Sequence, residues 1–578
     1  MGPVRGKRLG VCVACFVLIS GGCAFNPPTP SSSAAMSPTP SAQTPPRGSG
    51  LAADQVLRVA IPEPVGLDPT SMAAPEILRA LQRPLVDFND RGEIVPALAE
   101  SWDISEGGKT LTFRLREARY SNGYPIVAAD MVYSARRLAD PRTAANYAYV
   151  MAAVVGGSDL VAMAGANPEP SDDQIEAALQ RLGVDAPDER TFVVHLENPR
   201  SEFLSAMTLW VLAPLQEKWI NSPNATDAGN FVSSGPFILD TWDHLSRIVL
   251  KPNPYWWGDV KPNLAEIQMR IATGDFSQQL AYEAGELDLA ITPTEDVLRV
   301  KEDPSLRAEF HEAPVLGINA YSFNNFQDPT ADRFEDKGPT ANRDFRVALA
   351  QAIDKQALID ATWAGLGTVA NSFIMPGIPG HQPDLDPYPY GPEAAQRRMT
   401  AALEALGVGT AAEVGPLSIA FPTGHDNEAR VAFLVEAWRQ AFGLEFDQFG
   451  IEEGAFYAEV PTGAFDVFFD NWGADYPAPG NQLNGTFTCG GGLNFRHYCN
   501  RAFDAIVGKA AVEQDPERQV ALYEDAQTVL MEDAPILPLR YEVQPYEVRP
   551  YVAGLTEYPP GFRLPGDYYY ETVQILDH

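Results

Sequence analysis

The feature that most constrains the fold is an alternation of helical and strand patterns along the chain. Apolar residues recur at helical spacing in some segments, and in others they alternate or form short runs bounded by turn residues. Such alternation predicts an α/β protein, and the more than 500 residues after Gly50 are enough for several domains. In order, the main segments are strands over 56–61 and 111–115, a helix over 128–138, a helical face at Phe345, Ala348, Leu349, Ala352 and Ile353, a helix ending at Leu406, a strand over 417–421, a helix over 429–442, a strand over 465–469, a helix from Asp515-Pro516 to about Met531, and a strand over 536–539.

The first 22 residues have the pattern of an export signal. Arg5, Lys7 and Arg8 precede an uncharged run over 9–19, and small residues follow it. Eleven residues are too few to cross a bilayer core that needs about 20, so the run is not a lasting anchor. We expect residues 1–22 to be removed during export.

Cys23 comes directly after the small residues Ser20, Gly21 and Gly22. This order resembles the lipobox of bacterial lipoproteins, in which the cysteine thiol is acylated and the chain is cut just before it. A branched apolar residue is usual three positions before that cysteine, and Ser20 stands there in this chain. The pattern favours a lipid on Cys23, and the alternative is an ordinary secretory signal with an incidental cysteine.

The segment that follows Cys23 has the composition of a tether. Of residues 24–50, seven are Pro, nine are Ser or Thr, and Arg47 carries the only charge. Such a segment cannot bury enough apolar surface to offset its ordering entropy. We therefore expect residues 23–50 to link a lipid anchor to a protein that folds in water.

The chain is strongly acidic, with 76 Asp and Glu against 42 Lys and Arg and a formal net charge of −34. That charge repels nucleic acid and anionic membrane surfaces. We expect no nucleic-acid partner, and a link to the membrane has to come from the lipid.

Two cysteines remain after the signal and Cys23 are set aside. Cys489 and Cys499 lie ten apart across a glycine-rich stretch, and in an oxidising compartment they are expected to form a disulfide. The alternative is a metal site, for which His497 is the one obvious further ligand. We expect neither a metal nor a cofactor.

The sequence motifs of several enzyme classes are incomplete or absent in this sequence. Gly107-Gly108-Lys109-Thr110 lacks the glycine that a phosphate-binding loop needs six residues before its lysine, because Asp103 stands there. No Gly-x-Ser-x-Gly elbow occurs in the sequence, and no two of its seven histidines fall within four residues of each other. Nothing in the sequence predicts a catalytic residue.

Seven stretches, in order over some 450 residues, resemble the peptide-binding family of solute receptors for bacterial ABC importers (extracellular solute-binding family 5). One such stretch would be weak support, and seven in the right order are strong. They are residues 84–116 (PLVDFNDRGEIVPALAESWDISEGGKTLTFRLR), 120–141 (YSNGYPIVAADMVYSARRLADP), 234–237 (SGPF), 253–256 (NPYW), 285–288 (GELD), 345–354 (FRVALAQAID) and 471–479 (NWGADYPAP).

The resemblance implies a fold and a division of the chain. The fold is a multi-domain α/β periplasmic-binding-protein architecture of type II, in three parts, with a discontinuous first domain. We expect the ligand to be enclosed where the first and third domains close on each other. The expected divisions are residues 51–76, 222–317 and 543–578 for domain I, 77–221 for domain II and 318–542 for domain III.

The resemblance also implies a site for the common features of peptides, which are an ammonium, backbone amides and a carboxylate. In relatives an aspartate at the position of Asp475 pairs with the peptide ammonium, and Asp is suited to that charge. Gly473 and Ala474 offer an open backbone for strand addition, and Trp472 and Tyr476 offer flat walls. The alternative for Asp475 is a turn residue before Pro477.

Four further positions match pocket-lining places of the family. Glu63 matches one such place, with Val65 beside it in a backbone-pairing stretch, although Glu63 could equally be a solvated loop carboxylate. Thr292 and Tyr541 match the others. Some oligopeptide receptors carry an arginine three residues before the tryptophan to meet a ligand carboxylate, and here that residue is Phe469.

The resemblance predicts a lipid-anchored, extracytoplasmic receptor, expected to be monomeric, that captures oligopeptides and delivers them to the permease subunits of an ABC transporter. One alternative keeps the architecture and replaces the peptide by haem, a metal complex or a sugar. Another, from a different class, is a secreted α/β hydrolase, which the missing nucleophile elbow disfavours.

Overall fold

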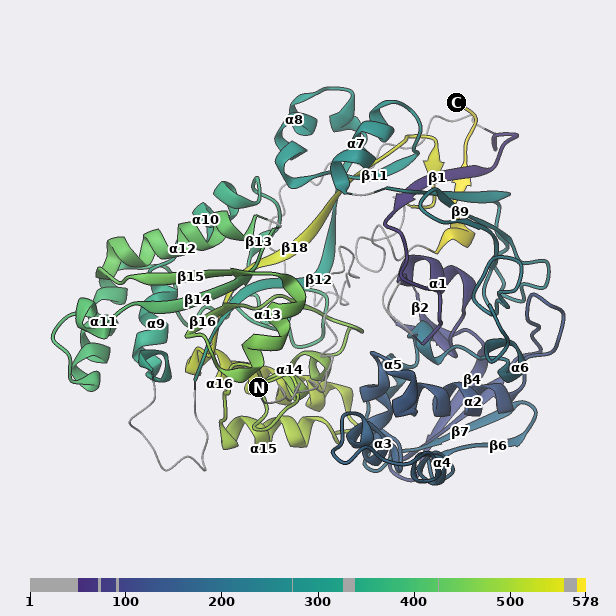
Figure 1. Cartoon of the computed structure of the whole chain (residues 1–578), viewed down its shortest axis with the longest axis horizontal. Helices are drawn as coiled ribbons and strands as arrows, with labels where there is room; N and C mark the ends of the chain where they lie inside the picture. The colour runs from purple at the N-terminus through teal and green to yellow at the C-terminus, as the bar shows by residue number, and fades with distance from the viewer. Residues whose placement is uncertain are drawn as a thin grey trace, which may run out of the picture.

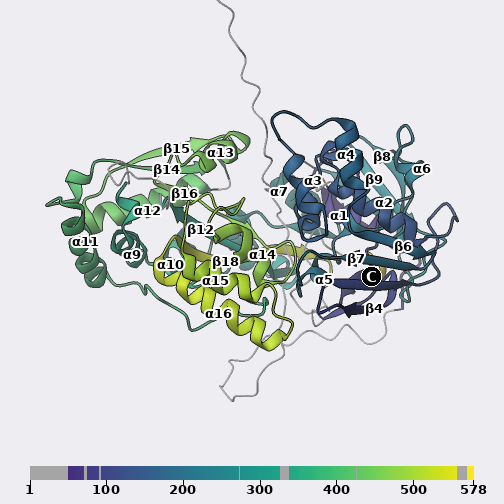
Figure 2. The ribbon, with the colours of Figure 1, turned by 90° about the horizontal axis from the view of Figure 1, so that it is seen from below.

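The computed structural model describes residues 50–70, 74–89, 93–272, 274–325, 338–424, 426–555 and 569–578. These residues form two lobes, with the helices and strands of the first half of the chain in one lobe and most of the second half in the other (Figure 1). Figure 2 shows the same two lobes from below. The expected signal, Cys23 and the tether up to Ser49 lie outside the described residues.

The first lobe is built on two four-stranded sheets. One has the order β1-β10-β9-β8 and the other β4-β5-β7-β6, and the second is antiparallel throughout. The expected strand over 56–61 is β1, which pairs in parallel with β10. The bounds are β1 (Val56–Ile61), β4 (Ala99–Ser105), β5 (Thr110–Leu115), β6 (Val184–Asp188), β7 (Thr191–His195), β8 (Phe237–Asp243), β9 (Arg247–Pro252) and β10 (Glu266–Ile271), with a separate hairpin of β2 (Val86–Phe88) and β3 (Ile94–Pro96).

The second lobe is built on an eight-stranded sheet with the path β11-β18-β12-β16-β14-β15. Strands β14, β15 and β16 are parallel, so their carboxyl ends meet at one edge of the sheet. The bounds are β11 (Leu289–Ile291), β12 (Phe310–Phe323), β13 (Thr368–Val369), β14 (Leu417–Pro422), β15 (Phe446–Ile451), β16 (Val467–Phe469), β17 (Trp472–Gly473) and β18 (Ile536–Val548), and β19 (Val552–Ala553) pairs with β20 (Gln574–Ile575).

Strands β12 and β18 are the longest in the molecule and connect the lobes. They pair with each other in antiparallel register, from Phe310 opposite Glu547 to Ser322 opposite Ile536. The register shifts between Pro314 and Ile318, so the ladder is irregular between its two ends. In Figure 1 the two strands run side by side from the second lobe toward β11 at the top.

Helices cover the sheets of both lobes (Figure 1). The helices of the first lobe and its junction are α1 (Pro75–Leu81), α2 (Ala128–Ala139), α3 (Gly157–Met163), α4 (Asp172–Leu179), α5 (Phe203–Ala206), α6 (Glu217–Ile220), α7 (Asp275–Glu283) and α8 (Val297–Glu302). The helices of the second lobe are α9 (Arg343–Gln351), α10 (Lys355–Thr362), α11 (Pro392–Leu406), α12 (Asn427–Phe442), α13 (Glu453–Glu459), α14 (Pro479–Phe487), α15 (Arg501–Ala510) and α16 (Pro516–Asp533). None of the described helices is long and apolar enough to span a membrane.

Each lobe has its own hydrophobic core. The predicted helical face is buried, with Phe345, Ala348 and Leu349 at 0% exposure in the core of the second lobe. Asp515 caps α16 as expected, because its carboxylate accepts from the backbone N–H groups of Glu517 and Arg518. Apolar periodicity and a capping residue therefore predicted these two helices.

Two strand predictions were wrong in extent. Strand β16 begins at Val467 and not at Phe465, because Asp466 Oδ2 accepts from both the backbone N–H and the hydroxyl of Ser418 in place of ladder contacts. Strand β18 continues to Val548 and does not end at Leu539, because β11, β12 and β13 all pair along it.

Candidate functional site

The segment after β16 carries an exposed backbone at the centre of the molecule. It bends at Asp470 and forms the short strand β17, in which Gly473 pairs with Gly317 of β12. Ala474 continues this pairing by donating its N–H to Leu316 O at 2.9 Å. Gly473 is exposed, and a Cβ at this position would have Leu316 O of β12 as its nearest neighbour, 3.9 Å away.

Asp475 follows directly and joins the two lobes. Its Oδ2 accepts a hydrogen bond from the hydroxyl of Tyr149 in the first lobe at 2.5 Å. The same oxygen accepts from Asn481 Nδ2 at 3.1 Å, and Asn481 Oδ1 accepts from the backbone N–H of Asp475 at 3.0 Å. Tyr149 and Asn481 thus hold the carboxylate with neutral donors, Tyr147 adds a third neutral contact, and no cation pairs with Asp475 among the described residues.

Burial of the Asp475 carboxyl raises its pKa above the ordinary value for aspartate, and the hydrogen bonds from Tyr149 and Asn481 act in the opposite direction. Burial likewise raises the pKa of Tyr149 well above its usual range, with the Asp475 carboxylate adding to this. A half-buried carboxylate without a counter-charge is unfavourable, and it would attract a cation brought to it.

Aromatic residues flank Asp475 on both sides. Trp472 is 8% exposed and belongs to the core of the second lobe, while Tyr476 packs against the core of the first. The indole Nε1 of Trp472 is buried and has no hydrogen-bond partner in the part of the chain that the structure describes. The segment 472–476 therefore touches both lobes within five residues.

A second contact between the lobes lies next to this segment. Glu202 in the first lobe accepts the backbone N–H of Gly480, in the first turn of α14, at 2.9 Å. Burial raises the pKa of Glu202, and hydrogen bonds from Tyr523 and Gly480 oppose the shift. A Cβ on Gly480 would lie 2.0 Å from Glu202 Oε2, so this approach requires glycine.

Tyr541 lies in the same part of the sheet. Ile318 of β12 is opposite Trp472 on one side and opposite Tyr541 on the other, so the three residues form a row across three strands. The Tyr541 hydroxyl donates to Ser372 O at 2.9 Å and lies 2.9 Å from the Ser372 hydroxyl. The geometry brings Tyr541 near the segment 472–476, with its hydroxyl already engaged.

Glu63 and Val65 lie in the first lobe, after β1. Glu63 is half-buried and accepts from His244 Nδ1 at 2.8 Å, Leu245 N at 3.0 Å and Trp242 Nε1 at 3.2 Å. It is therefore a hydrogen-bonded anchor of the β8–β9 turn and not a solvated loop carboxylate. Val65 is 98% exposed.

Thr292 follows β11 and is 1% exposed. Its hydroxyl donates to Glu547 Oε2 at 3.1 Å, and its N–H donates to Pro545 O at 3.1 Å. Both partners belong to β18, and no described contact joins Thr292, Glu63 or Val65 to Asp475. The structure thus brings together residues 472–476 and Tyr541, and it holds the other three apart from them.

Sequence reasoning missed Tyr149, Asn481 and Glu202. Tyr149 lies in a single-turn segment (Ala148–Ala153) with no periodic pattern, 326 residues before Asp475. Asn481 stands six residues after Asp475, where a short polar side chain after a Pro-rich turn is a usable local signal. Nothing local to Tyr149 or Glu202 indicates a partner in the other lobe.

The comparison with known families identifies the family of the chain. The sequence profile described as "Bacterial extracellular solute-binding proteins, family 5 Middle" matches residues 93–494. The chain belongs to this family. Family 5 proteins are the solute-binding components of ABC transporters and not enzymes.

Individual relatives within family 5 cover nearly the whole chain. The periplasmic murein peptide-binding protein MppA of Escherichia coli is 28% identical over 92% of this chain and 95% of its own length. The periplasmic oligopeptide-binding protein OppA of the same organism is 28% identical over 80% of this chain and 82% of its own. The unliganded open form of MppA superposes with a TM-score of 0.74 at 25% identity, covering 92% of this chain and 99% of the other. The periplasmic-binding-protein fold is confirmed.

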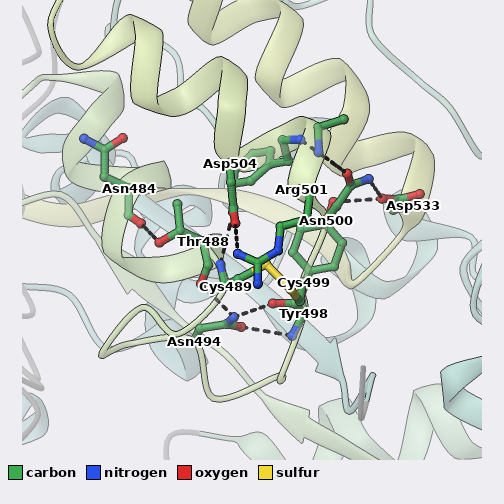
Figure 3. The surroundings of a disulfide bond; sticks show 12 residues. Asn484, Thr488, Cys489, Asn494, Tyr498, Cys499, Asn500, Arg501, Asp504 and Asp533 are labelled. Atoms are coloured by element: carbon green, nitrogen blue, oxygen red, sulfur yellow. Dashed lines mark hydrogen bonds and ion pairs between the residues drawn. A yellow bond between two sulfur atoms is a disulfide. The ribbon is translucent and has the colours of Figure 1, made fainter. Parts of the chain in front are cut away.

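Cys489 and Cys499 form a disulfide that closes the loop between α14 and α15 (Figure 3). Asn494 holds this loop from inside, since its Nδ2 donates to Thr488 O at 3.0 Å and its Oδ1 accepts from Tyr498 N at 3.1 Å. Asp504 of α15 accepts the N–H of Cys489 at 3.1 Å. In the part of the chain that the structure describes, no group of three or more His, Cys, Asp or Glu could hold a metal ion.

Proposed function

We propose that this protein is an extracytoplasmic receptor that captures oligopeptides between its lobes and delivers them to an ABC permease. The observation that carries the proposal is the half-buried carboxylate of Asp475, hydrogen-bonded by Tyr149 from the opposite lobe and two residues from the exposed Gly473. A peptide ammonium supplies the cation that this carboxylate lacks, and the pair would be a charge-assisted hydrogen bond. The names of MppA and OppA, which bind peptides, support the same ligand class.

The peptide backbone would be bound by strand addition. Among the described residues strand β17 pairs with β12 alone, and its other edge at Gly473, with the following Ala474, can accept an extended ligand. Backbone pairing is independent of side-chain identity, so one receptor can take many sequences. Trp472 and Tyr476 would enclose the first ligand residue between flat apolar surfaces.

The three-part division belongs to this proposal. Domain I would comprise residues 51–76, 222–317 and 543–578, domain II residues 77–221, and domain III residues 318–542. The two boundaries at 317/318 and 542/543 fall inside β12 and β18, next to the register shift between Pro314 and Ile318. An irregular two-stranded connection can bend while its ends stay paired, which suits closure of the lobes around a ligand.

Membrane attachment would come from a lipid on Cys23, with residues 24–50 as the tether. The net charge of −34 disfavours electrostatic binding to an anionic membrane. A receptor held at the membrane in this way would remain free to open and close.

Native mass spectrometry of the protein, purified after export and without denaturation, tests the capture of peptides. We expect a ladder of bound masses that denaturation releases as oligopeptides of mixed sequence. A single bound species that is not a peptide would contradict the proposal and favour a haem, metal-complex or sugar ligand on the same scaffold.

A further inference from the structure

A buried ion pair lies directly beside residues 472–476, here named the site segment. Arg496 Nη2 pairs with Asp470 Oδ2, and the two side chains are 1% and 6% exposed. Asp470 stands two residues before the site segment on the same stretch of chain. A buried ion pair is often no more stabilising than apolar residues of the same volume, which leaves its effect on the position of the neighbouring chain as its distinct contribution.

The backbone support of this stretch becomes weaker at Asp470. Before it, residues 467–468 of β16 pair with 419–420 of β14 as well as with β12. From Asp470 onward the described pairing is with β12 alone, through the N–H of Asp470 to Ala320 O at 3.0 Å and then through β17. A strand held along one edge moves more easily than one held along both. The chain that carries Asp475 therefore starts where half of its ladder ends.

Arg496 ties Asp470 to two further elements at this point. The hydroxyl of Ser322, on β12, donates to Asp470 Oδ2 and accepts from Arg496 Nε at 3.0 Å. Arg496 Nη1 donates to Thr486 O, in the last turn of α14, at 2.6 Å. The guanidinium carbon is 4.3 Å from the ring centroid of Phe487. All three guanidinium nitrogens are thus engaged, and they connect Asp470 to both β12 and α14.

The backbone at Arg496 is fixed as well. Its carbonyl oxygen accepts from the N–H of Asn325 at 2.8 Å and from Asn325 Nδ2 at 3.2 Å. Arg496 lies between Cys489 and Cys499 in sequence, but none of these bonds involves a cysteine. Arg496 should therefore stay in place when the disulfide is reduced.

The position of Asp470 determines the position of the site segment. Asp470 and Trp472 are two residues apart on one extended stretch, so their side chains share a face, and both are buried, at 6% and 8% exposure. The register against β12 is unbroken between them, because Phe469 is opposite Tyr321 and Trp472 is opposite Ile318. A displacement of Asp470 would therefore be passed to Trp472 and to the rest of the site segment.

We propose that Arg496 is a positioning residue for ligand capture, which through Asp470 holds the site segment in place against β12. This arrangement puts the carboxylate of Asp475 and the exposed backbone of Gly473 within reach of the same ligand. The inference rests on the proposed peptide-binding function. Arg496 does not touch the ligand, since its side chain is 1% exposed.

The test removes the whole polar network and not one charge. Arg496→Gln alone would leave Asp470 buried without a partner, so a loss of binding could reflect unfolding. The triple variant Ser322→Ala/Asp470→Leu/Arg496→Met leaves no unpaired charge, and apolar replacements of a buried ion pair often preserve stability. We expect a thermal unfolding midpoint close to that of the unmodified protein, and affinity for tetraalanine weakened by about tenfold or more, as coupling between neighbouring residues permits.

Two further readouts report on position, which a contribution to stability alone would not change. N-acetyltetraalanine lacks the ammonium that Asp475 would pair with, so the ratio of affinities between the free and the acetylated peptide should fall in the triple variant. Hydrogen–deuterium exchange should become faster over residues 470–476 and stay unchanged over 417–422 of β14.

Arg346→Met is the matched control. Arg346 is 2% exposed in the same lobe, and it donates to Ala534 O and Thr340 O, each at 2.9 Å. Its loss should lower stability and leave tetraalanine affinity unchanged below the unfolding transition. If the triple variant does not fold, Arg496→Lys replaces it, because lysine keeps the charge beside Asp470 and loses the planar fork. That variant should show the same changes in affinity, ratio and exchange at smaller size.

The outcomes separate this inference from the function on which it rests. A folded variant with unchanged affinity and unchanged ratio would show that the ion pair is structural only, while peptide capture stands. Equal loss for free and acetylated tetraalanine, with unchanged exchange over 470–476, would also contradict the positioning role. If the unmodified protein binds no peptide in any form, the proposed function and the inference both fail.

Discussion

The hydroxyl of Tyr149 donates a hydrogen bond to Oδ2 of Asp475 at 2.5 Å, although the two residues are 326 positions apart and belong to different lobes. Because Asp475 also accepts from Asn481, its orientation is fixed from both lobes at once. The affinity of this carboxylate for a ligand ammonium should therefore depend on closure of the lobes as well as on charge.

Replacement of Asp475 by asparagine should weaken peptide binding by about 2–5 kcal/mol, since a buried ammonium loses its counter-charge. N-acetylated peptides should bind the unmodified protein poorly for the same reason, and Asp475→Asn should distinguish free from acetylated peptides much less. Calorimetry on the four protein–peptide combinations measures both effects. Equal binding of free and acetylated peptides by the unmodified protein would remove Asp475 from the site.

The control for this experiment should be Asp447→Asn, because Asp447 is an exposed residue of β15. Asp470 is nearer in sequence but unsuitable. Its carboxylate forms a buried ion pair with Arg496, with side chains 6% and 1% exposed, and also accepts from Ser322. Loss of one partner of such a pair costs about 3–5 kcal/mol of stability, which would confound a binding measurement.

Gly480→Ala should loosen the contact between the lobes. The new Cβ would lie 2.0 Å from Glu202 Oε2 and 2.5 Å from the Tyr523 hydroxyl, so Glu202 has to move away and lose the N–H of Gly480. We expect a more open average conformation, visible as a larger radius of gyration in X-ray scattering, together with weaker peptide binding. Gly485→Ala is the matched control, since it lies on the same helix α14 with nothing within 4 Å of the added Cβ. Equal radii of gyration for the two variants would contradict this account of the contact.

Reduction of the Cys489–Cys499 disulfide should lower the free energy of unfolding by about 3 kcal/mol, because the bond restricts a short loop mainly in the unfolded chain. Peptide affinity should change by less than about threefold, because the disulfide and the candidate peptide site share no partners and changes at independent sites have little effect on each other. Denaturant unfolding with and without reductant measures the change in the free energy of unfolding, and calorimetry under the same two conditions measures the change in peptide affinity. The double variant Cys489→Ser/Cys499→Ser should be insensitive to reductant, and a large loss of affinity on reduction would show that the loop supports the site.

Cys23→Ala should release the protein from the membrane and leave peptide affinity unchanged. The tether separates the lipid site from the folded lobes, so the two functions should be energetically independent. Fractionation of cells that express the variant, followed by calorimetry on the released protein, checks both parts. Continued membrane association of a correctly processed variant would count against acylation of Cys23.

Local elements were predictable because their signals are local. The buried face of α9, the cap at Asp515 and the alternating strand β5 all follow from residues within one or two turns of each other. The errors at β16 and β18 arose where long-range pairing or a side chain such as Asp466 decided the extent of a strand. No window of sequence contains that information.

The same distinction applies to the site. Residues 472–476 could be predicted as candidate site residues because they form one contiguous motif on one segment. Tyr149 and Glu202 were missed because each acts through a contact with the opposite lobe. Pairings of this kind depend on how the lobes and layers pack, which apolar periodicity does not encode.

Peptide affinity should fall as the pH is lowered, and the fall should begin at a higher pH than for an ordinary aspartate. Burial raises the pKa of Asp475, with Tyr149 and Asn481 opposing, and only its ionised form can pair with an ammonium. Below that pKa each unit of pH should reduce affinity by up to about tenfold, since one proton competes with one ligand.

Glu202 also has a pKa raised by burial, and its protonation would weaken the contact with Gly480. Calorimetry from about pH 7.5 to 4.5 distinguishes the contributions of the two carboxyl groups to the pH dependence of peptide affinity. Asp475→Asn should remove the steep part of that dependence, and Glu202→Gln should leave it in place. An unchanged slope in Asp475→Asn would assign the pH dependence to another group and would remove the main electrostatic support for Asp475 as the ammonium partner.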